Sequence, residues 1–209
     1  MAETEASGAG AAFGALLGES PIDMDRCSAF LDGLSHAERV EAIRAVGRRG
    51  QAALYEAARG FSPVRLEDLV PAGAGDGKTV RHFGKNTLPA FTHFEKRFCR
   101  PAGQDPASPE QLWGFNFQTM QPLTGPGYFI ARPSPEAGDT PEVWVDYNQV
   151  PPEAAAGWPA VRSNERGLSR FVYGFMIDTL RRVSEHVTIG SAARKGKDLG
   201  SWFLLTREP

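Results

Sequence analysis

Apolar side chains recur every three or four positions in the first third of the chain, a spacing that predicts helices. Ser20 followed by Pro21 has the pattern of a helix start, with Ser20 as the N-cap. Ser35 begins a capping-box pattern that opens a second helix, expected to reach about residue 59. Residues 20–60 are therefore predicted to form a helical hairpin, and the small residues 1–19 before them a flexible tail.

The next helical spacing follows a short predicted strand at residues 79–83. A helix over residues 86–99 would carry one apolar stripe, made of Leu88, Phe91, Phe94 and Phe98. The basic residues of this segment fall off that stripe and are expected in solvent: His93, Lys96, Arg97 and Arg100. We therefore expect one helix inserted among the strands that follow.

From Leu112 onward the period changes to two residues, which predicts strands. Trp113, Phe115 and Phe117 alternate with glycine and polar residues. Turn-rich sequences then separate two predicted hairpins, with strands at residues 128–132 and 142–148, and at 186–194 and 199–207. A long Pro/Ala-rich connection, residues 150–163, lies between them.

Residues 168–183 fit either a helix or a strand. Gly174 would weaken a helix interior, and the residues just before it favour a strand. We predict a strand to about residue 174 and a short helix over residues 176–182. On that helix Asp178 and Arg181 would form a local ion pair.

Several predicted strands are apolar on both faces, so both faces must be covered. Val143-Trp144-Val145 is one example. The economical solution for residues 61–209 is a mainly antiparallel β-barrel or strongly curled sheet, partly roofed by the N-terminal helices, in an α+β fold. Gly190 and Ala192, facing inward, would leave room for one small ligand.

The C-terminal third resembles the closing motif of bacterial lipocalin-like (calycin-type) barrels of unknown function. The residues that carry the resemblance are Asp178–Val183, Val187–Gly190, Lys195-Gly196-Lys197 and Trp202–Arg207. The resemblance implies a calycin-like barrel with an internal cavity, and it carries no catalytic residues across. The N-terminal hairpin and the helix at 86–99 would be departures from that pattern.

Composition and charge then restrict the class of partner. Hydrophobic residues make up 41% of the chain, which excludes disorder as its main state. The net charge is −2, so neither nucleic acid nor a membrane is expected as a partner. An acidic N-terminus unlike a signal peptide predicts a cytoplasmic protein with Cys27 and Cys99 reduced. The oligomeric state is left open.

Two motifs suggest cofactor chemistry and neither is supported by its context. Residues 72–79 imitate a phosphate-binding loop, but Ala72 stands where that motif needs glycine, so nucleotide binding is rejected. The histidines are His36, His82, His93 and His186, without metal-ligand spacing. No cofactor or metal is predicted, and haem held by a single barrel histidine is kept as the alternative.

Aromatic residues of the strands supply the candidate ligand site: Trp113, Phe117, Tyr128, Trp144, Tyr147 and Tyr173. Asp146 and His186 are the candidates for fixing a ligand or transferring a proton. The leading hypothesis is a protein that binds a small, largely apolar molecule in a barrel cavity. The alternatives are an isomerase- or cyclase-type enzyme on a lipophilic substrate, using an Asp or His of the same cavity, and a protein-interaction module.

Overall fold

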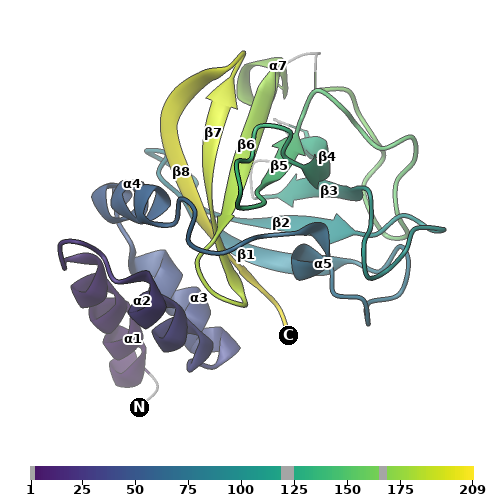
Figure 1. Ribbon diagram of the computed structural model, residues 1–209. Coiled ribbons are helices and arrows are strands. Elements are labelled where there is room, and N and C mark those ends of the chain that lie inside the picture. The colour runs from purple at the N-terminus through teal and green to yellow at the C-terminus, as the bar shows by residue number, and fades with distance from the viewer. Residues whose placement is uncertain (1–2, 119–124, 165–168) are drawn as a thin grey trace.

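The computed structural model describes residues 3–118, 125–164 and 169–209, and within them eight antiparallel strands close into a barrel. The strands pair in chain order and β1 closes on β8 (Figure 1). Their bounds are β1 (Val80–Asn86), β2 (His93–Cys99), β3 (Leu112–Phe117), β4 (Tyr128–Pro133), β5 (Val143–Asp146), β6 (Met176–Arg182), β7 (Val187–Arg194) and β8 (Lys197–Arg207). The predicted barrel is therefore confirmed, and it is closed.

Helices occupy the N-terminal region, although not as the predicted hairpin. Their bounds are α1 (Glu3–Leu17), α2 (Met24–Asp32), α3 (His36–Ala45) and α4 (Arg48–Ala57). The prediction of a tail over residues 1–19 is wrong, because α1 covers most of it and buries Phe13 completely. The prediction of a helix start at Ser20 is wrong as well, since α2 begins at Met24 and Asp23 is its N-cap.

The capping box at Ser35 is confirmed, with reciprocal bonds between Ser35 and Glu38. The helix that it opens is shorter than predicted, because Val46 adopts an extended backbone and Gly47 becomes the N-cap of α4. Among the described residues, no helix combines the length and the apolar character that crossing a bilayer requires.

The four N-terminal helices lie together on one side of the barrel, beside β8 and β1 (Figure 1). Outward-facing residues of the late strands, among them Ile189 and Leu204, are fully buried in a cluster with Leu31, Ile43 and Leu54 of the helices. The helices therefore cover one outer face of the barrel, as the two-faced apolar strands require. Cys27 and Cys99 are both buried and unbonded, as predicted.

Strand register fixes which residues face the barrel interior. Lys96 of β2 stands opposite His82 of β1 and Asn116 of β3, so these three share the interior face. Glycines make room for the rings that fill this space. A Cβ on Gly114 would lie 2.1 Å from the ring of Phe129.

One end of the barrel is filled by the connector that precedes β1. This connector contains the short helix α5 (Leu66–Leu69), and Leu66 and Leu69 are buried in the interior core with Val80 and Leu180. The Nε2 atom of His82 lies 2.9 Å from the Leu69 carbonyl oxygen, which holds the connector in place. The barrel interior is therefore closed at this end.

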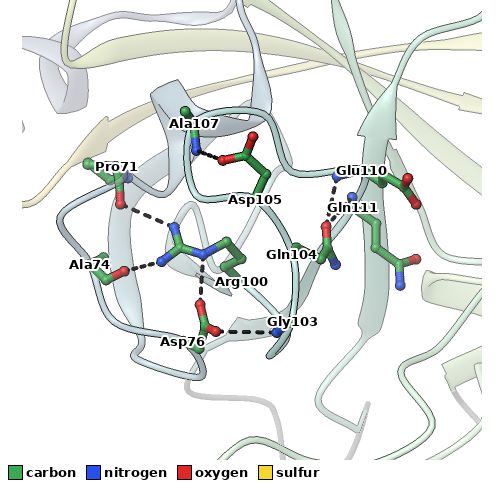
Figure 2. A network of polar contacts seen from close by, with 10 residues as sticks. All are labelled: Pro71, Ala74, Asp76, Arg100, Gly103, Gln104, Asp105, Ala107, Glu110 and Gln111. Carbon is green, nitrogen blue, oxygen red and sulfur yellow. Dashed lines mark hydrogen bonds and ion pairs between the residues drawn. The ribbon is translucent and has the colours of Figure 1, made fainter.

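A single arginine organises the loops around the closed end. Figure 2 shows the Arg100 guanidinium inside the loop that begins at Pro71, with Nε donating to Asp76 Oδ1 at 2.8 Å and the remaining nitrogens bonding to the Pro71 and Ala74 carbonyls. The bond to Arg100 lowers the pKa of Asp76. The loop that imitates a phosphate-binding motif is thus closed around a side chain of the protein itself.

Two predicted helices are strands, and these are the main corrections to the fold. Instead of an inserted helix, residues 86–99 form the last residue of β1, the connecting loop and β2. Phe94, Lys96 and Phe98 of β2 face the interior at a period of two. Residues 169–183 have the reverse of the predicted order, and Leu168 lies outside the described residues. The helix comes first, as α7 (Ser169–Val172), and β6 follows.

Candidate functional site

A cavity of about 430 Å³ occupies the other end of the barrel. On β2, Phe94 and Lys96 line it while Phe98 does not, and on β6 Met176 and Asp178 line it while Leu180 does not. Lys96 and Asp178 are therefore at its inner end, toward α5. Most of the remaining wall is apolar and comes from Leu88, Ala90, Phe91, Val172, Tyr173, Ala192, Leu199, Trp202 and Phe203.

The inner end holds a cluster of four polar side chains, Lys96, Asn116, Tyr147 and Asp178. Lys96 Nζ donates to Asp178 Oδ2 at 3.0 Å and to Asn116 Oδ1 at 3.2 Å, and it also contacts the Tyr147 hydroxyl. That hydroxyl accepts from Asn116 Nδ2 at 2.9 Å and lies 3.2 Å from Asp178 Oδ2, to which it donates. Four strands or strand ends thus meet in one network.

Burial dominates the electrostatics of this cluster. The Lys96 and Asp178 side chains are 2% and 3% exposed. Burial lowers the pKa of Lys96 and raises the pKa of Asp178, and in each case the opposite charge of the partner opposes the shift. Burial, together with Asp178, also raises the pKa of Tyr147 well above its ordinary value, so its hydroxyl stays protonated as a donor.

One oxygen atom of the polar cluster has no hydrogen-bond partner among the described residues. This atom is Oδ1 of Asp178, and it is buried. Buried carboxylate oxygens are almost always hydrogen-bonded, because leaving one unpaired costs about 1–3 kcal/mol or more. An acceptor without a partner beside a cavity is the feature expected where a ligand supplies the donor.

Aromatic rings enclose the Lys96 amine. Its Nζ lies 4.8 Å from the ring centroid of Phe203, 5.0 Å from that of Tyr147 and 5.1 Å from that of Phe129. The negative faces of such rings stabilise a cation within about 6 Å. The inner end of the cavity is therefore suited to a positive charge with one carboxylate counter-ion.

The outer part of the cavity is mostly apolar, although Asn86, Gln118, Arg194 and Ser201 also line it. Leu88, Phe91 and Leu199 line the cavity and are nevertheless 49%, 56% and 42% exposed. Phe117, the last residue of β3, and Phe175, just before β6, are also exposed at this end. The exposed apolar residues of the rim and the mostly apolar wall give a hydrophobic molecule a path from solvent to the polar cluster.

Two of the six predicted aromatic site residues line this cavity. Tyr147 and Tyr173 stack with ring centroids 5.4 Å apart. The other four belong to the outer face of their strands, since they alternate with interior residues: Trp113, Phe117, Tyr128 and Trp144. Tyr128, for example, packs on Trp158 and donates its hydroxyl to the Pro159 carbonyl, beneath the connection at residues 150–163.

The two candidates for proton transfer lie away from the cavity. Asp146 is on the outer face of β5, where it accepts from Arg132 at 3.0 Å and from the Asn148 backbone at 2.9 Å. His186 precedes β7, and its Nδ1 lies 3.3 Å from the Arg207 guanidinium. Neither is among the residues that line the cavity.

The carboxylate in the cavity is Asp178, which was predicted to form an ion pair with Arg181 on a helix. That prediction is wrong because residues i and i+3 of a strand point to opposite faces. Arg181 faces outward and bonds to Glu142 and to the Tyr55 carbonyl. Lys96, expected in solvent, was missed, although the period of two through Phe94, Lys96 and Phe98 would have placed it with the two phenylalanines.

The positions of the histidines and acidic residues bear on metal binding. Within the described residues, no group of three or more His, Cys, Asp or Glu side chains is placed to hold a metal ion. His82 is the histidine of the barrel interior, and its Nε2 is engaged by Leu69. Comparisons with protein-family models, with curated proteins and with solved structures return no match.

Proposed function

We propose that this protein binds one small, largely apolar molecule in its barrel, with a polar end of that molecule at the Lys96–Asp178 cluster. The observation that carries the proposal is the cavity of about 430 Å³, whose wall is mostly apolar and whose inner end holds a polar cluster. Binding sites for small molecules commonly have this size and this combination of apolar wall and few polar groups.

The resemblance of the C-terminal strands to calycin-type barrels supports the same proposal. An eight-stranded barrel is wide enough for one small ligand when some inward residues are small, and Gly190 and Ala192 are such residues. We place the protein, on this proposal, among cytoplasmic calycin-like carriers of hydrophobic molecules.

The proposal is tested by a substitution that fills the cavity with a larger side chain, with a matched substitution on the outer face of the same strand as control. Ala192 lines the cavity opposite Asp178, whereas its neighbour Ala193 faces outward with Ile177. We expect Ala192→Phe to abolish binding of naphthylmethanol, measured by its fluorescence, and Ala193→Phe to preserve it. Native mass spectrometry of the purified protein would then identify a retained ligand. Equal binding by both variants would overturn the proposal.

A second candidate, an isomerase- or cyclase-type enzyme on a lipophilic substrate, is favoured by Asp178. Its unpartnered Oδ1 is a buried carboxylate oxygen beside an apolar cavity, the setting in which a carboxylate acts as a general base. The test is the shift of a double bond into conjugation in an unsaturated ketone, followed by ultraviolet absorbance. Turnover that is lost in Asp178→Asn would support the enzyme, and absence of turnover in the wild type would exclude this reaction.

A further inference from the structure

Lys96 supplies a kind of chemistry that simple binding does not require. Among the described residues that line the cavity, it carries the only primary amine. The other lysines of the chain are Lys78, Lys85, Lys195 and Lys197. An apolar cavity with one amine at its inner end, a carboxylate beside that amine and a phenol touching both is the arrangement in which lysine reacts with carbonyl compounds.

We propose that Lys96 forms an imine with an apolar aldehyde or ketone held in the barrel. This inference rests on the proposed function, because the carbonyl compound must first occupy the cavity. It deepens that function by naming the ligand class, a hydrophobic molecule whose inner end is a carbonyl group.

The reaction balances with the groups present. The Lys96 ammonium passes one proton to Asp178 Oδ2, 3.0 Å away, and the freed nitrogen pair attacks the carbonyl carbon. The carbonyl oxygen takes the proton from Asp178, and the new nitrogen–carbon adduct returns one to it. Asp178 then protonates the carbinolamine hydroxyl, which leaves as water while the nitrogen pair forms the double bond. One water is released, the iminium keeps the positive charge, and nothing is oxidised or reduced.

The geometry supports each stage of that sequence. Burial lowers the pKa of Lys96 and raises that of Asp178, and both shifts favour the neutral amine and acid needed for attack. Asp178 Oδ1 has no partner among the described residues and is free to accept from the carbinolamine hydroxyl. Tyr147 and Asn116 hold the nitrogen in position.

The product is also matched to its surroundings. The protonated imine keeps one N–H, which Asp178 Oδ2 accepts, so the ion pair survives the reaction. The rings of Phe203, Tyr147 and Phe129, all about 5 Å from Nζ, stabilise an iminium as they stabilise an ammonium. The reaction exchanges one buried cation for another and leaves no uncompensated charge.

The experiment traps the imine. The full chain is incubated with naphthaldehyde and sodium cyanoborohydride, which reduces an iminium to a stable secondary amine, and modified lysines are located by peptide mass spectrometry. Lys96 is expected to carry the naphthylmethyl group before any other lysine. Excess naphthylmethanol, which fits the same cavity but has no carbonyl, is expected to suppress modification at Lys96 and not at Lys85, which bonds to Arg44 outside the barrel.

Matched variants sharpen the result. Lys96→Arg keeps the charge but is expected to lose the cavity adduct, whereas Lys85→Arg keeps it. If Lys96→Arg does not fold, competition by the alcohol in the wild type decides the matter. Binding of the alcohol with no adduct at Lys96 would overturn the imine and leave the proposed function standing. Failure of both the alcohol and the aldehyde to bind would overturn both.

Discussion

Lys96 and Asp178 pair across the width of the barrel, with Nζ 3.0 Å from Oδ2. The strands that carry them, β2 and β6, lie on opposite sides of the closed strand order. Most contacts in a barrel join neighbouring strands, so this pair ties together two walls that no backbone hydrogen bond connects. It also places a charge of each sign where the cavity ends.

The cross-barrel pair predicts strong coupling between two substitutions. Lys96→Met or Asp178→Leu alone leaves a buried charge without its partner and is expected to cost about 3–5 kcal/mol of unfolding free energy. The double variant removes both charges and is expected to cost much less than the sum. Denaturant unfolding of the four proteins, analysed as a double-mutant cycle, measures the coupling. Additive effects would show that the pair does not stabilise the barrel.

Tyr147→Phe is expected to weaken ligand binding as well as the fold. It removes a hydroxyl that accepts from Asn116 and donates to Asp178, so we expect a loss of about 1–3 kcal/mol in stability. Binding of naphthylmethanol should weaken in parallel. Tyr128→Phe is the control, because that hydroxyl bonds to Pro159 outside the barrel. A loss of affinity in the Tyr128 variant equal to that in the Tyr147 variant would contradict the placement of the site.

Acid is expected to destabilise the protein through His82. Burial lowers the pKa of His82 from 6.5 to about 3, so between these values the unfolded chain binds a proton that the folded protein does not. Stability is therefore full above pH 6.5 and falls as the pH drops, by about 1.4 kcal/mol per unit from this residue. Unfolding free energies measured at about pH 7 and about pH 5 should differ by about 2 kcal/mol less in His82→Gln than in the wild type.

The glutamine variant keeps an N–H donor for the Leu69 carbonyl and does not titrate, so the comparison isolates the proton. His93→Gln serves as control, because His93 is exposed at the start of β2. The same pH slope in His82→Gln and in the wild type would show that His82 is accessible to protons in the folded state.

Gly190→Ala tests how tightly the interior rings are packed. A Cβ at this position would lie 2.2 Å from the ring of Phe203, which lines the cavity, so the ring must move. We expect a destabilisation of about 1–3 kcal/mol in denaturant unfolding, together with weaker naphthylmethanol binding. Gly138→Ala, with nothing within 4 Å of the new Cβ, should leave both unchanged. Unchanged stability and unchanged naphthylmethanol binding in the Gly190 variant would contradict the close packing of Phe203 against this position.

The sequence predicted the hairpins whose strands alternate clearly and whose turns have a marked composition. The β7–β8 hairpin is such a case, since its turn contains Gly196 at a φ of 74°, a backbone conformation that favours glycine. The helix predicted over residues 86–99 rests on the helical spacing of Leu88, Phe91, Phe94 and Phe98, and Lys96, which lies off that stripe, is expected in solvent. In a sequence, a charged residue that is buried in an ion pair cannot be distinguished from a solvent-exposed one until its partner is known.

Local sequence pattern was also insufficient to identify the polar residues of the cavity. Tyr147 and the adjacent Asp146 are both candidates from the sequence, but Tyr147 lines the cavity whereas Asp146 points outward and accepts from Arg132. The carboxylate that meets Tyr147 is Asp178, brought from β6 by strand pairing. Lys96 and Asp178 are 82 residues apart in the sequence. They meet because the strands close into a barrel, which the local sequence pattern does not reveal.

Among the described residues, the connector containing α5 closes one end of the barrel, and the cavity lies at the other end. A molecule held against Lys96 has Leu66 and Leu69 behind it and the rim of Leu88, Phe91 and Leu199 ahead. On the proposed function, a second molecule therefore has no entry at the α5 end, and exchange requires the bound molecule to leave first. The dissociation rate of such a ligand should then be independent of the concentration of competitors, and substitutions in the rim should change its residence time.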